Sequence, residues 1–431
     1  MNFTYYIPTR ILFGRGALNE LHTQKLPGKK AMIVTTAGKS IRKYGYLDRV
    51  SEELAKAEVS IVLFDRIQPN PVKQHVMEGA ELARRKQCDF IVGLGGGSSI
   101  DSAKSIALMA TNEGDYWDYI AGGTGKAQVP QNRPLPVVAI TTTAGTGSEA
   151  DPWTVITKEE TNEKIGFGYD DTFPVLSIVD PELMASVPPS LTAFQGFDAL
   201  FHSTEGYLAQ CANPVSDALS LKAIELIGKH LPSAVRNGKD MAAREGMAIA
   251  NTLSGMVEST SSCLSEHSLE HALSAYHPDL PHGAGLIMIS QAYYTHFAQA
   301  HACDSRLIDM ARALGKKDAT HPMDFVIALV QLQVACGVDN LKMSDYGIRR
   351  EDLPVMAKNA RDTMGDLFLL DPIALSEEDC IAIYEQSYRY SRHPFHPIKP
   401  VSRPVLYFPL FLPTVSNTFH RLKNGGRVPE A

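Results

Sequence analysis

The stretch L-G-G-G-S-S-I-D at residues 94–101 decides how the first half of this chain is interpreted. It follows the apolar run F-I-V-G-L at residues 90–94, which is typical of a buried strand, and a helical pattern begins at Ser102. A glycine-rich turn at the start of a helix offers free backbone N–H groups at the positive end of the helix dipole, which suits a pyrophosphate. The stretch matches neither G-x-G-x-x-G nor a P-loop, and an ordinary tight turn is an equal alternative.

Short apolar runs alternate with helical patterns on both sides of this stretch. Strand-like runs lie at residues 31–34, 61–64, 137–140 and 177–179, and helical patterns lie at residues 47–57 and 72–86. Strands separated by helices of this length indicate βαβ units and a parallel sheet. A second loop, T-T-T-A-G-T-G-S-E at residues 141–149, also follows a strand. Because ligands bind at the carboxyl ends of the strands in such sheets, the two loops together indicate a nucleotide crevice.

The pattern changes at V-P-P-S, residues 187–190, where two prolines end the preceding structure and Ser190 is a candidate helix N-cap. Long helical periodicities follow, for example at residues 217–230, 242–257 and 321–334. We therefore expect a dinucleotide-binding α/β domain at residues 1–187 and a helical catalytic domain at residues 188–390. The proline-rich, basic tail at residues 391–431 is expected to be poorly structured or to lie on the surface.

Composition excludes several classes of protein. The chain has 431 residues, 44% of them hydrophobic and 21% charged, as in an ordinary globular protein. A net charge of -7 argues against a nucleic-acid binder, and no apolar run is long enough to cross a membrane. The six cysteines form no C-x-x-C pair, so neither a zinc ribbon nor a dense disulfide framework is indicated. Without a secretory signal, the expected location is the reducing cytoplasm.

Two pairs of side chains have the spacing of metal ligands on one helix face. Asp198 and His202 form the first i,i+4 pair, His267 and His271 form the second, and His282 follows in P-H-G. Either pair alone is explained by a solvated helix face. The two pairs together with His282 instead indicate that the groups converge on one metal ion. Nitrogen donors with a carboxylate suit Fe²⁺, Zn²⁺, Co²⁺ or Ni²⁺, and spacing does not say which of the five groups is left out. Further candidate ligands are Glu205 and Glu266.

These motifs together resemble the iron-containing, or group III, alcohol dehydrogenase family. The matching pieces run in the same order from about residue 5 to about residue 390; they are P-N-P at 69–71, G-G-G-S-x-x-D-x-A-K at 95–104, T-T-x-A-G-T-G-S-E at 141–149, Asp198-x-x-x-His202, His267-x-x-x-His271 and P-H-G at 281–283. The resemblance implies a Rossmann-like α/β N-terminal domain and an all-α C-terminal domain, the architecture of dehydroquinate synthase. The active-site cleft would lie between the two domains.

The resemblance also implies a role for each matching residue. The metal, expected to be Fe²⁺ with Zn²⁺ as the alternative, would be held by Asp198, His202, His267 and His282. His271 would instead face the substrate and the nicotinamide as a proton relay. The pyrophosphate of NAD(P) would lie on Gly96, Gly97 and Ser98. The rest of the cofactor cleft would be lined by Asn70, Asp101, Thr141, Thr142, Thr146 and Lys164.

The residues that follow the predicted strand at residues 31–34 bear on the choice between NAD and NADP. Family members that use NAD have an aspartate there, whereas this chain has Gly38, with Lys39 and Ser40 beside it. None of these would repel a 2′-phosphate, so we expect NADP in preference to NAD. The chain departs from the family in a longer loop between His271 and His282, which makes His277 a fallback ligand. A second departure is S-S-C-L-S-E at residues 261–266, in place of a glycine-rich lead into His267.

The expected function is reversible hydride transfer between a small primary alcohol or diol and its aldehyde. The resemblance also implies a homodimer or larger homo-oligomer. One alternative is a lyase of the dehydroquinate synthase kind, which would need basic residues near the metal, but residues 194–206 contain no lysine or arginine. A non-catalytic nucleotide-binding protein is the other alternative, and the intact ligand set argues against it. Side chains that we consider for the substrate pocket are Trp153, Phe167 and Tyr276.

Overall fold

A computed structural model describes residues 2–389 of the chain, so the predicted tail lies outside the described residues. Six parallel strands form the main sheet, in the order β1 (Arg10–Phe13), β8 (Leu176–Val179), β5 (Val137–Thr141), β4 (Phe90–Gly95), β2 (Lys30–Thr36) and β3 (Ser60–Ile67). The neighbours β4, β5 and β8 are buried along their whole length. Burial on both faces explains why these strands are continuous apolar runs in the sequence.

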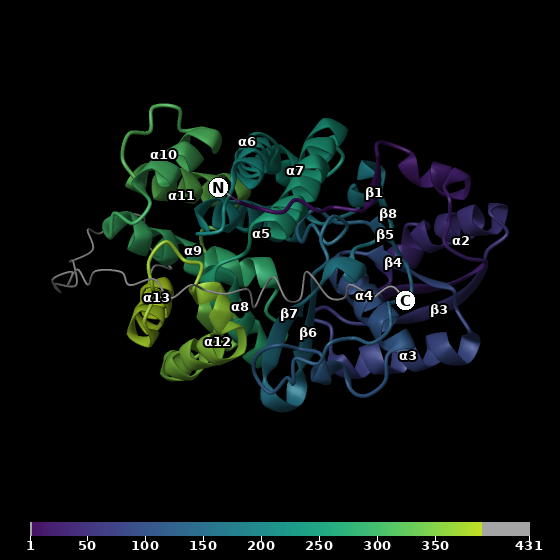
Figure 1. Cartoon of the computed structure of the whole chain (residues 1–431). Coiled ribbons are helices and arrows are strands. Elements are labelled where there is room, and N and C mark those ends of the chain that lie inside the picture. The colour runs from purple at the N-terminus through teal and green to yellow at the C-terminus, as the bar shows by residue number, and fades with distance from the viewer. Residues whose placement is uncertain (1, 390–431) are drawn as a thin grey trace.

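Helices cover both faces of this sheet (Figure 1). Met32 and Val34 of β2 pack with α3 (Lys73–Lys86) and α4 (Gly97–Thr111) on one face. Ala31 and Ile33 pack with α2 (Tyr46–Lys56) and the 3-10 helix η1 (Ala17–Thr23) on the other. Alternate residues of one strand therefore belong to two cores, as the two-residue repeat of a strand requires. The predicted Rossmann-like fold class is confirmed for this half.

A short antiparallel hairpin extends from the sheet half towards the helices. Its strands are β6 (Thr154–Lys158) and β7 (Glu163–Phe167), which pair from Thr154–Phe167 to Lys158–Glu163. Strand β6 contacts α4, whereas β7 contacts α8 and α12 of the helical half. The sequence pattern predicted neither this hairpin nor the edge strand β1.

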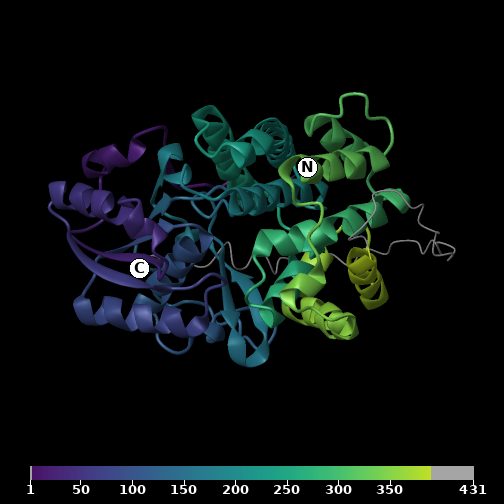
Figure 2. The ribbon, with the colours of Figure 1, turned by 180° about the vertical axis from the view of Figure 1, so that it is seen from behind.

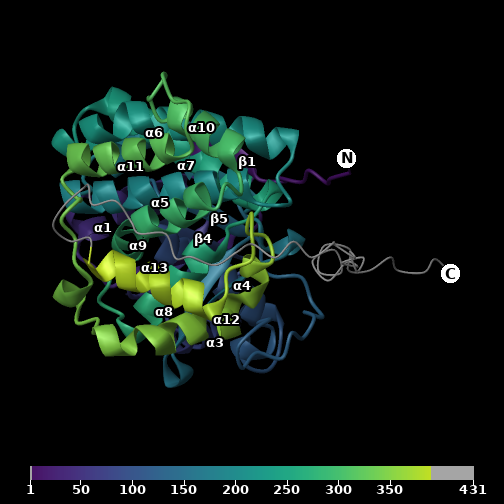
Figure 3. The same ribbon diagram turned by 90° about the vertical axis from the view of Figure 1, so that its left-hand side faces the viewer.

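Every regular element among residues 188–389 is a helix, which confirms the all-α second half. Figures 2 and 3 show this half from behind and from its own side. Its helices are α5 (Pro189–Leu208), α6 (Pro214–Arg236), α7 (Met241–Thr260), α8 (Ser265–Tyr276), α9 (His282–Gln299), α10 (Asp304–Ala313), α11 (Met323–Cys336), α12 (Leu353–Phe368) and α13 (Glu377–Arg389). Among the described helices, none has the length and apolar composition that crossing a bilayer requires.

Helix α5 carries the first predicted ligand pair, and its start differs from the sequence prediction. The N-cap is Pro188 and the helix begins at Pro189, so the prediction that Ser190 caps it is wrong. Pro189 suits the first helical position because its φ is already fixed and its missing N–H has no partner to lose there. The helix packs against α6, α7 and α9, which buries most of its length in the core of this half.

Candidate metal centre and cofactor cleft

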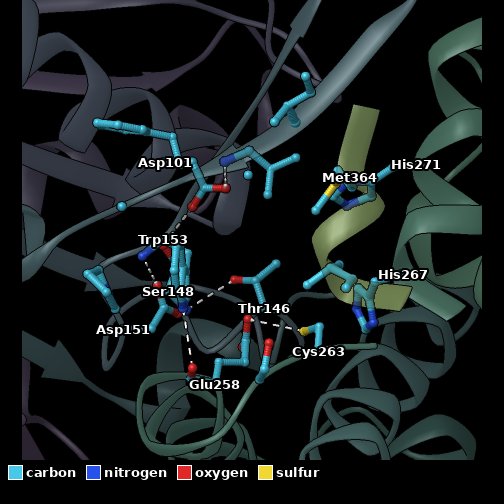
Figure 4. Close-up of a pocket in the computed structure, with 18 of the residues that line it drawn as sticks. Asp101, Thr146, Ser148, Asp151, Trp153, Glu258, Cys263, His267, His271 and Met364 are labelled. Carbon is cyan, nitrogen blue, oxygen red and sulfur yellow. Dashed lines mark hydrogen bonds between the residues drawn. The ribbon is translucent and has the colours of Figure 1, made fainter. Parts of the chain in front are cut away.

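A cavity of about 770 Å³ separates the glycine loops from the helices (Figure 4). Gly97, Ser98 and Thr146 line it from the sheet half. The helical half contributes the candidate metal ligands and residues 361–367 of α12. Both sides of the predicted cleft therefore face one space, large enough for a small-molecule ligand.

Three helices bring the four predicted metal ligands together. Asp198 and His202 lie one turn apart on α5, His267 lies on α8, and His282 is the first residue of α9. The Oδ1 atom of Asp198 lies 3.5 Å from Nε2 of His202, 3.7 Å from Nε2 of His267 and 3.3 Å from Nε2 of His282. The rings of His202 and His267 stack with centroids 4.5 Å apart. One carboxylate oxygen is thus surrounded by three imidazole nitrogens.

Buried carboxylates on the far side of two rings fix their orientation. Nδ1 of His267 contacts Oε1 of Glu205 at 2.5 Å, and Nδ1 of His282 contacts Oε2 of Glu270. Because a carboxylate can only accept, both Nδ1 atoms are donors, so in the neutral form of each ring Nε2 carries the lone pair. Carboxylate–histidine pairs of this kind orient metal ligands in proteins and raise their basicity.

The donor set fits a divalent transition metal. Asp198 Oδ1 and His267 Nε2 are buried and have no hydrogen-bond partner, a costly arrangement that a cation between them would relieve. Burial would raise the pKa of Asp198, but the imidazoles of His202 and His282 hold it well below its ordinary value. Burial lowers the pKa of His202 to about 3. Burial would lower the pKa of His267 and His282, but neighbouring acidic groups raise it above the ordinary value. An ionised carboxylate and neutral imidazoles are the forms that bind metals, so a metal would displace a proton from these two rings. One oxygen with three nitrogens suits Fe²⁺ or Zn²⁺.

His271 lies one turn beyond His267 on α8 and also lines the cavity. Its ring centroid is 5.3 Å from that of His282, and its Nδ1 lies 3.0 Å from the sulfur of Met364. Burial, reinforced by the charge of Lys164, lowers its pKa well below the ordinary value, so the ring is neutral. Met364 has non-helical backbone angles inside α12, and this kink lies beside the ring of His271.

The predicted cofactor residues divide into two groups. Those that line the cavity are Asn70, Gly97, Ser98, Asp101, Thr146 and Lys164. Those that do not line it are Gly38, Ser40, Gly96, Thr141 and Thr142, which lie at or after the carboxyl ends of β2, β4 and β5. These strands are neighbours in the sheet, so the loops that follow them share one edge. A Cβ at Gly97 would lie 2.4 Å from Cγ2 of Thr146, so a glycine is needed where the two loops meet.

Protein contacts already hold several of the cavity-lining groups. The Asp101 carboxylate accepts from Ser148 Oγ at 2.6 Å and from the Val155 N–H at 3.0 Å, and burial raises its pKa to about 6. Lys164 Nζ donates to Asn70 Oδ1 at 3.1 Å. The Asn70 amide in turn donates to the carbonyls of Pro278 and Leu280 at 2.9 and 3.2 Å. Asn70 thus anchors the lengthened loop that precedes His282.

The structure also sorts the remaining candidates. Both oxygens of Glu205 are engaged, by His267 and by the Leu264 N–H, and Glu266 accepts from Tyr294, so neither belongs to the ligand cluster. His277 follows α8 and forms part of no metal-ligand group among residues 2–389. Trp153 and Phe167 line the cavity, whereas Tyr276 lines a separate pocket of about 170 Å³.

Sequence reasoning missed four residues around the cluster. Glu270 lies within H-S-L-E-H, three residues after His267, and this spacing was a usable signal. Glu258 lies 3.3 Å from Nδ1 of His202 and comes from α7, and Met364 comes from α12. Cys263 lines the cavity from the segment before α8. The one sequence signal for that segment was that S-S-C-L-S-E, at residues 261–266, replaces the glycine-rich stretch that precedes this histidine in the family.

Comparison with known proteins places the chain in a family. Its residues 8–181 match the model for iron-containing alcohol dehydrogenase, and residues 192–388 match that for the C-terminal part of the Fe-containing alcohol dehydrogenase family. "Alcohol dehydrogenase 4" of Schizosaccharomyces pombe is 39% identical over 391 residues, which cover 89% of this chain and 88% of the relative. "1,3-propanediol dehydrogenase" of Klebsiella pneumoniae is 34% identical over 397 residues, which cover 90% and 99%.

A solved structure agrees with these sequence matches. The archaeal halo-thermophilic Red Sea brine pool alcohol dehydrogenase ADH/D1, bound to NZQ, superposes with a TM-score of 0.86. Its sequence is 35% identical, and the match covers 90% of this chain and 99% of that one. The chain therefore belongs to the iron-containing alcohol dehydrogenase family. This membership confirms the expected fold class and the alcohol dehydrogenase class of oxidoreductase activity.

Proposed function

We propose that the chain catalyses reversible hydride transfer between a small primary alcohol or diol and its aldehyde, with NAD(P) as the hydride carrier. The observation that supports this most is the convergence of Asp198 and three imidazole nitrogens beside the cavity that the glycine loops line. These four residues would hold Fe²⁺, with Zn²⁺ as the alternative. The bound metal supplies Lewis acidity that polarises the substrate oxygen.

The protein's own residues position the reactants and move the proton. Gly97 and Ser98 begin α4, and backbone N–H groups at a helix start suit the cofactor's pyrophosphate. Trp153 and Phe167 form part of the cavity wall and exclude water from the reacting carbon. The neutral ring of His271 would accept the alcohol proton at Nε2, because its Nδ1 contacts Met364. The nicotinamide supplies the hydride chemistry.

Finer features of the proposal rest on the same observations. Gly38 and Ser40 are exposed after β2, where a 2′-phosphate meets no acidic repulsion, so NADP is the preferred cofactor. We place the boundary between the nucleotide domain and the catalytic domain at residue 188, where α5 is about to begin. Free cysteines support a cytoplasmic location. Exposed aromatic residues near the N-terminus, such as Tyr5 and Phe13, support a homo-oligomer.

The test combines metal analysis with turnover measurements. Purified protein should contain about one divalent metal per chain and should oxidise NADPH with a panel of short aldehydes, including 3-hydroxypropanal. A higher kcat/KM with NADPH than with NADH is expected. Bound metal without hydride transfer to any aldehyde would favour the lyase alternative. Nucleotide binding without metal would favour the non-catalytic alternative.

A further inference from the structure

The thiol of Cys263 faces the same cavity as the metal ligands, and the proposed function gives it no role. The segment that carries it, residues 261–264, joins α7 to α8 and is fixed at both ends. Ser261 Oγ donates to the Gly206 carbonyl at 2.7 Å, and the Leu264 N–H donates to the Glu205 carboxylate. Figure 4 shows Cys263 between Glu258 and His267. The sulfur atom is therefore held in a defined place beside the ligand cluster.

This sulfur atom completes a second group of metal donors. The Cys263 sulfur and one ring nitrogen each of His202 and His267 all lie within 4.8 Å of one another. The donor atoms of Asp198, His267 and His282 likewise all lie within 4.8 Å of one another. His267 is common to both groups, and its Nε2 is buried without a hydrogen-bond partner. The nitrogen that faces Asp198 is therefore also available to a cation held between Cys263, His202 and His267.

The two groups differ in the cation that they suit. Asp198 with His267 and His282 offers one oxygen and two nitrogens, which accommodate Fe²⁺ and Zn²⁺ alike. A thiolate is a softer donor, so a group of two nitrogens and one sulfur favours Zn²⁺ over Fe²⁺. The thiol is also oriented by a hydrogen-bond acceptor, because Oε2 of Glu258 lies 3.8 Å from the sulfur.

We propose that Cys263 is a further metal ligand of this chain, and that Zn²⁺ binds between Cys263, His202 and His267. A metal–sulfur bond forms and the S–H bond breaks, and the proton leaves to solvent through the cavity that Cys263 lines. No oxidant or reductant is needed. The proposal rests on the metal centre of the proposed function and adds a sulfur donor to it. Zn²⁺ and Fe²⁺ would then occupy overlapping positions that share His202 and His267.

Cobalt(II) is the probe that reports a sulfur ligand directly. Protein loaded with one equivalent of Co²⁺ should show a strong near-ultraviolet charge-transfer band from sulfur to cobalt. The Cys263→Ser variant should lose that band but keep the weaker visible bands and the cobalt content. Cys303→Ser is the matched control, because Cys303 is also a half-buried free thiol but forms no metal-ligand group among the described residues. This control variant should keep the band.

X-ray absorption of the zinc-loaded wild-type protein tests the proposal without any variant. A sulfur scatterer at about 2.3 Å beside nitrogen at about 2.0–2.1 Å supports it, and a shell of nitrogen and oxygen alone overturns it. Persistence of the cobalt band in Cys263→Ser would also overturn it. Stoichiometric cobalt without the band rejects Cys263 as a ligand but leaves the dehydrogenase proposal intact. Failure of the wild-type protein to bind cobalt or zinc rejects the metal centre itself.

Discussion

Replacing Glu205 with glutamine should weaken metal binding although Glu205 is not a ligand. Its side chain is fully buried, with one oxygen on Nδ1 of His267 and the other on the Leu264 N–H. Both the ring N–H of His267 and the backbone N–H of Leu264 therefore donate to this carboxylate, which has an acceptor oxygen for each. A glutamine has one acceptor oxygen, so either the Leu264 N–H loses its partner or the amide NH₂ faces His267. In the second case the ring carries its proton on Nε2, where the metal would bind.

The expected size of the effect follows from this conflict of donors. Loss of the carboxylate partner of a metal-bound histidine typically lowers metal affinity by about 10–100-fold. That corresponds to about 1.4–2.7 kcal/mol of binding free energy. The measurement is equilibrium dialysis of Glu205→Gln against buffered Zn²⁺ concentrations, with metal content by mass spectrometry. Circular dichroism checks that the variant is folded.

Glu266→Gln is the matched control for this experiment. Glu266 is equally buried and is adjacent to His267 in the chain, but it accepts from Tyr294 instead of contacting the ring. Burial and the charge of Glu205 raise its pKa well above the ordinary value, which favours the neutral form. Glutamine then replaces a neutral group of the same shape, and wild-type affinity is expected. If Glu205→Gln binds Zn²⁺ as tightly as the wild type while folded, the positioning role assigned to Glu205 is refuted.

Two further predictions concern the proton relay and the buried carboxylate of the second loop. His267→Ala should lose metal and activity together, whereas His271→Ala should keep the metal and turn over about 10²–10⁴-fold more slowly; metal loss from His271→Ala would contradict this division. Burial raises the pKa of Glu149 from 4.5 to about 7, so the folded state binds its proton more tightly than the unfolded state. Stability should therefore fall by up to about 3 kcal/mol as pH rises from about 4.5 to above 7. The free energy of unfolding of Glu149→Gln, measured with urea, should depend less on pH than that of the wild type. Identical slopes of unfolding free energy against pH for the two proteins would exclude titration of Glu149 as the cause.

Features encoded within a few residues of one another were predictable from the sequence. The buried strands β4 and β5, their glycine loops and the i,i+4 pairs on α5 and α8 all have local periodicity, and the structure contains each of them. Strand β1 was missed because its apolar run, residues 11–13, becomes a strand only by pairing with β8 about 165 residues later. The hairpin β6–β7 was missed because its short strands carry little apolar alternation and are fixed by contacts with α4 and α8.

The site was predictable to the same extent. Residue type and spacing marked five groups, Asp198, His202, His267, His271 and His282, and only the family resemblance set His271 apart from the four expected ligands. The residues that support these ligands were not predicted, since a carboxylate from α7 or a methionine from α12 reaches the cluster only through tertiary packing. Sequence spacing also left Glu205 open as a ligand, and only the structure shows that its Oε1 contacts Nδ1 of His267, a proposed ligand, instead.

Asn70 has a consequence for how the two halves of the molecule communicate. Its amide donates to two carbonyls of the loop that precedes His282, while its oxygen accepts from Lys164, which lies 3.5 Å from Glu270, the carboxylate that contacts His282. A cofactor that displaces or reorients Asn70 would therefore act on the same loop and ring that are proposed to hold the metal. Thermodynamic linkage then makes the effect mutual: whatever nucleotide binding does to metal affinity, metal binding does equally to nucleotide affinity. The metal-free enzyme would therefore bind the nucleotide with a different dissociation constant from the metal-loaded enzyme. A nucleotide affinity measured without metal would not apply to the metal-loaded form.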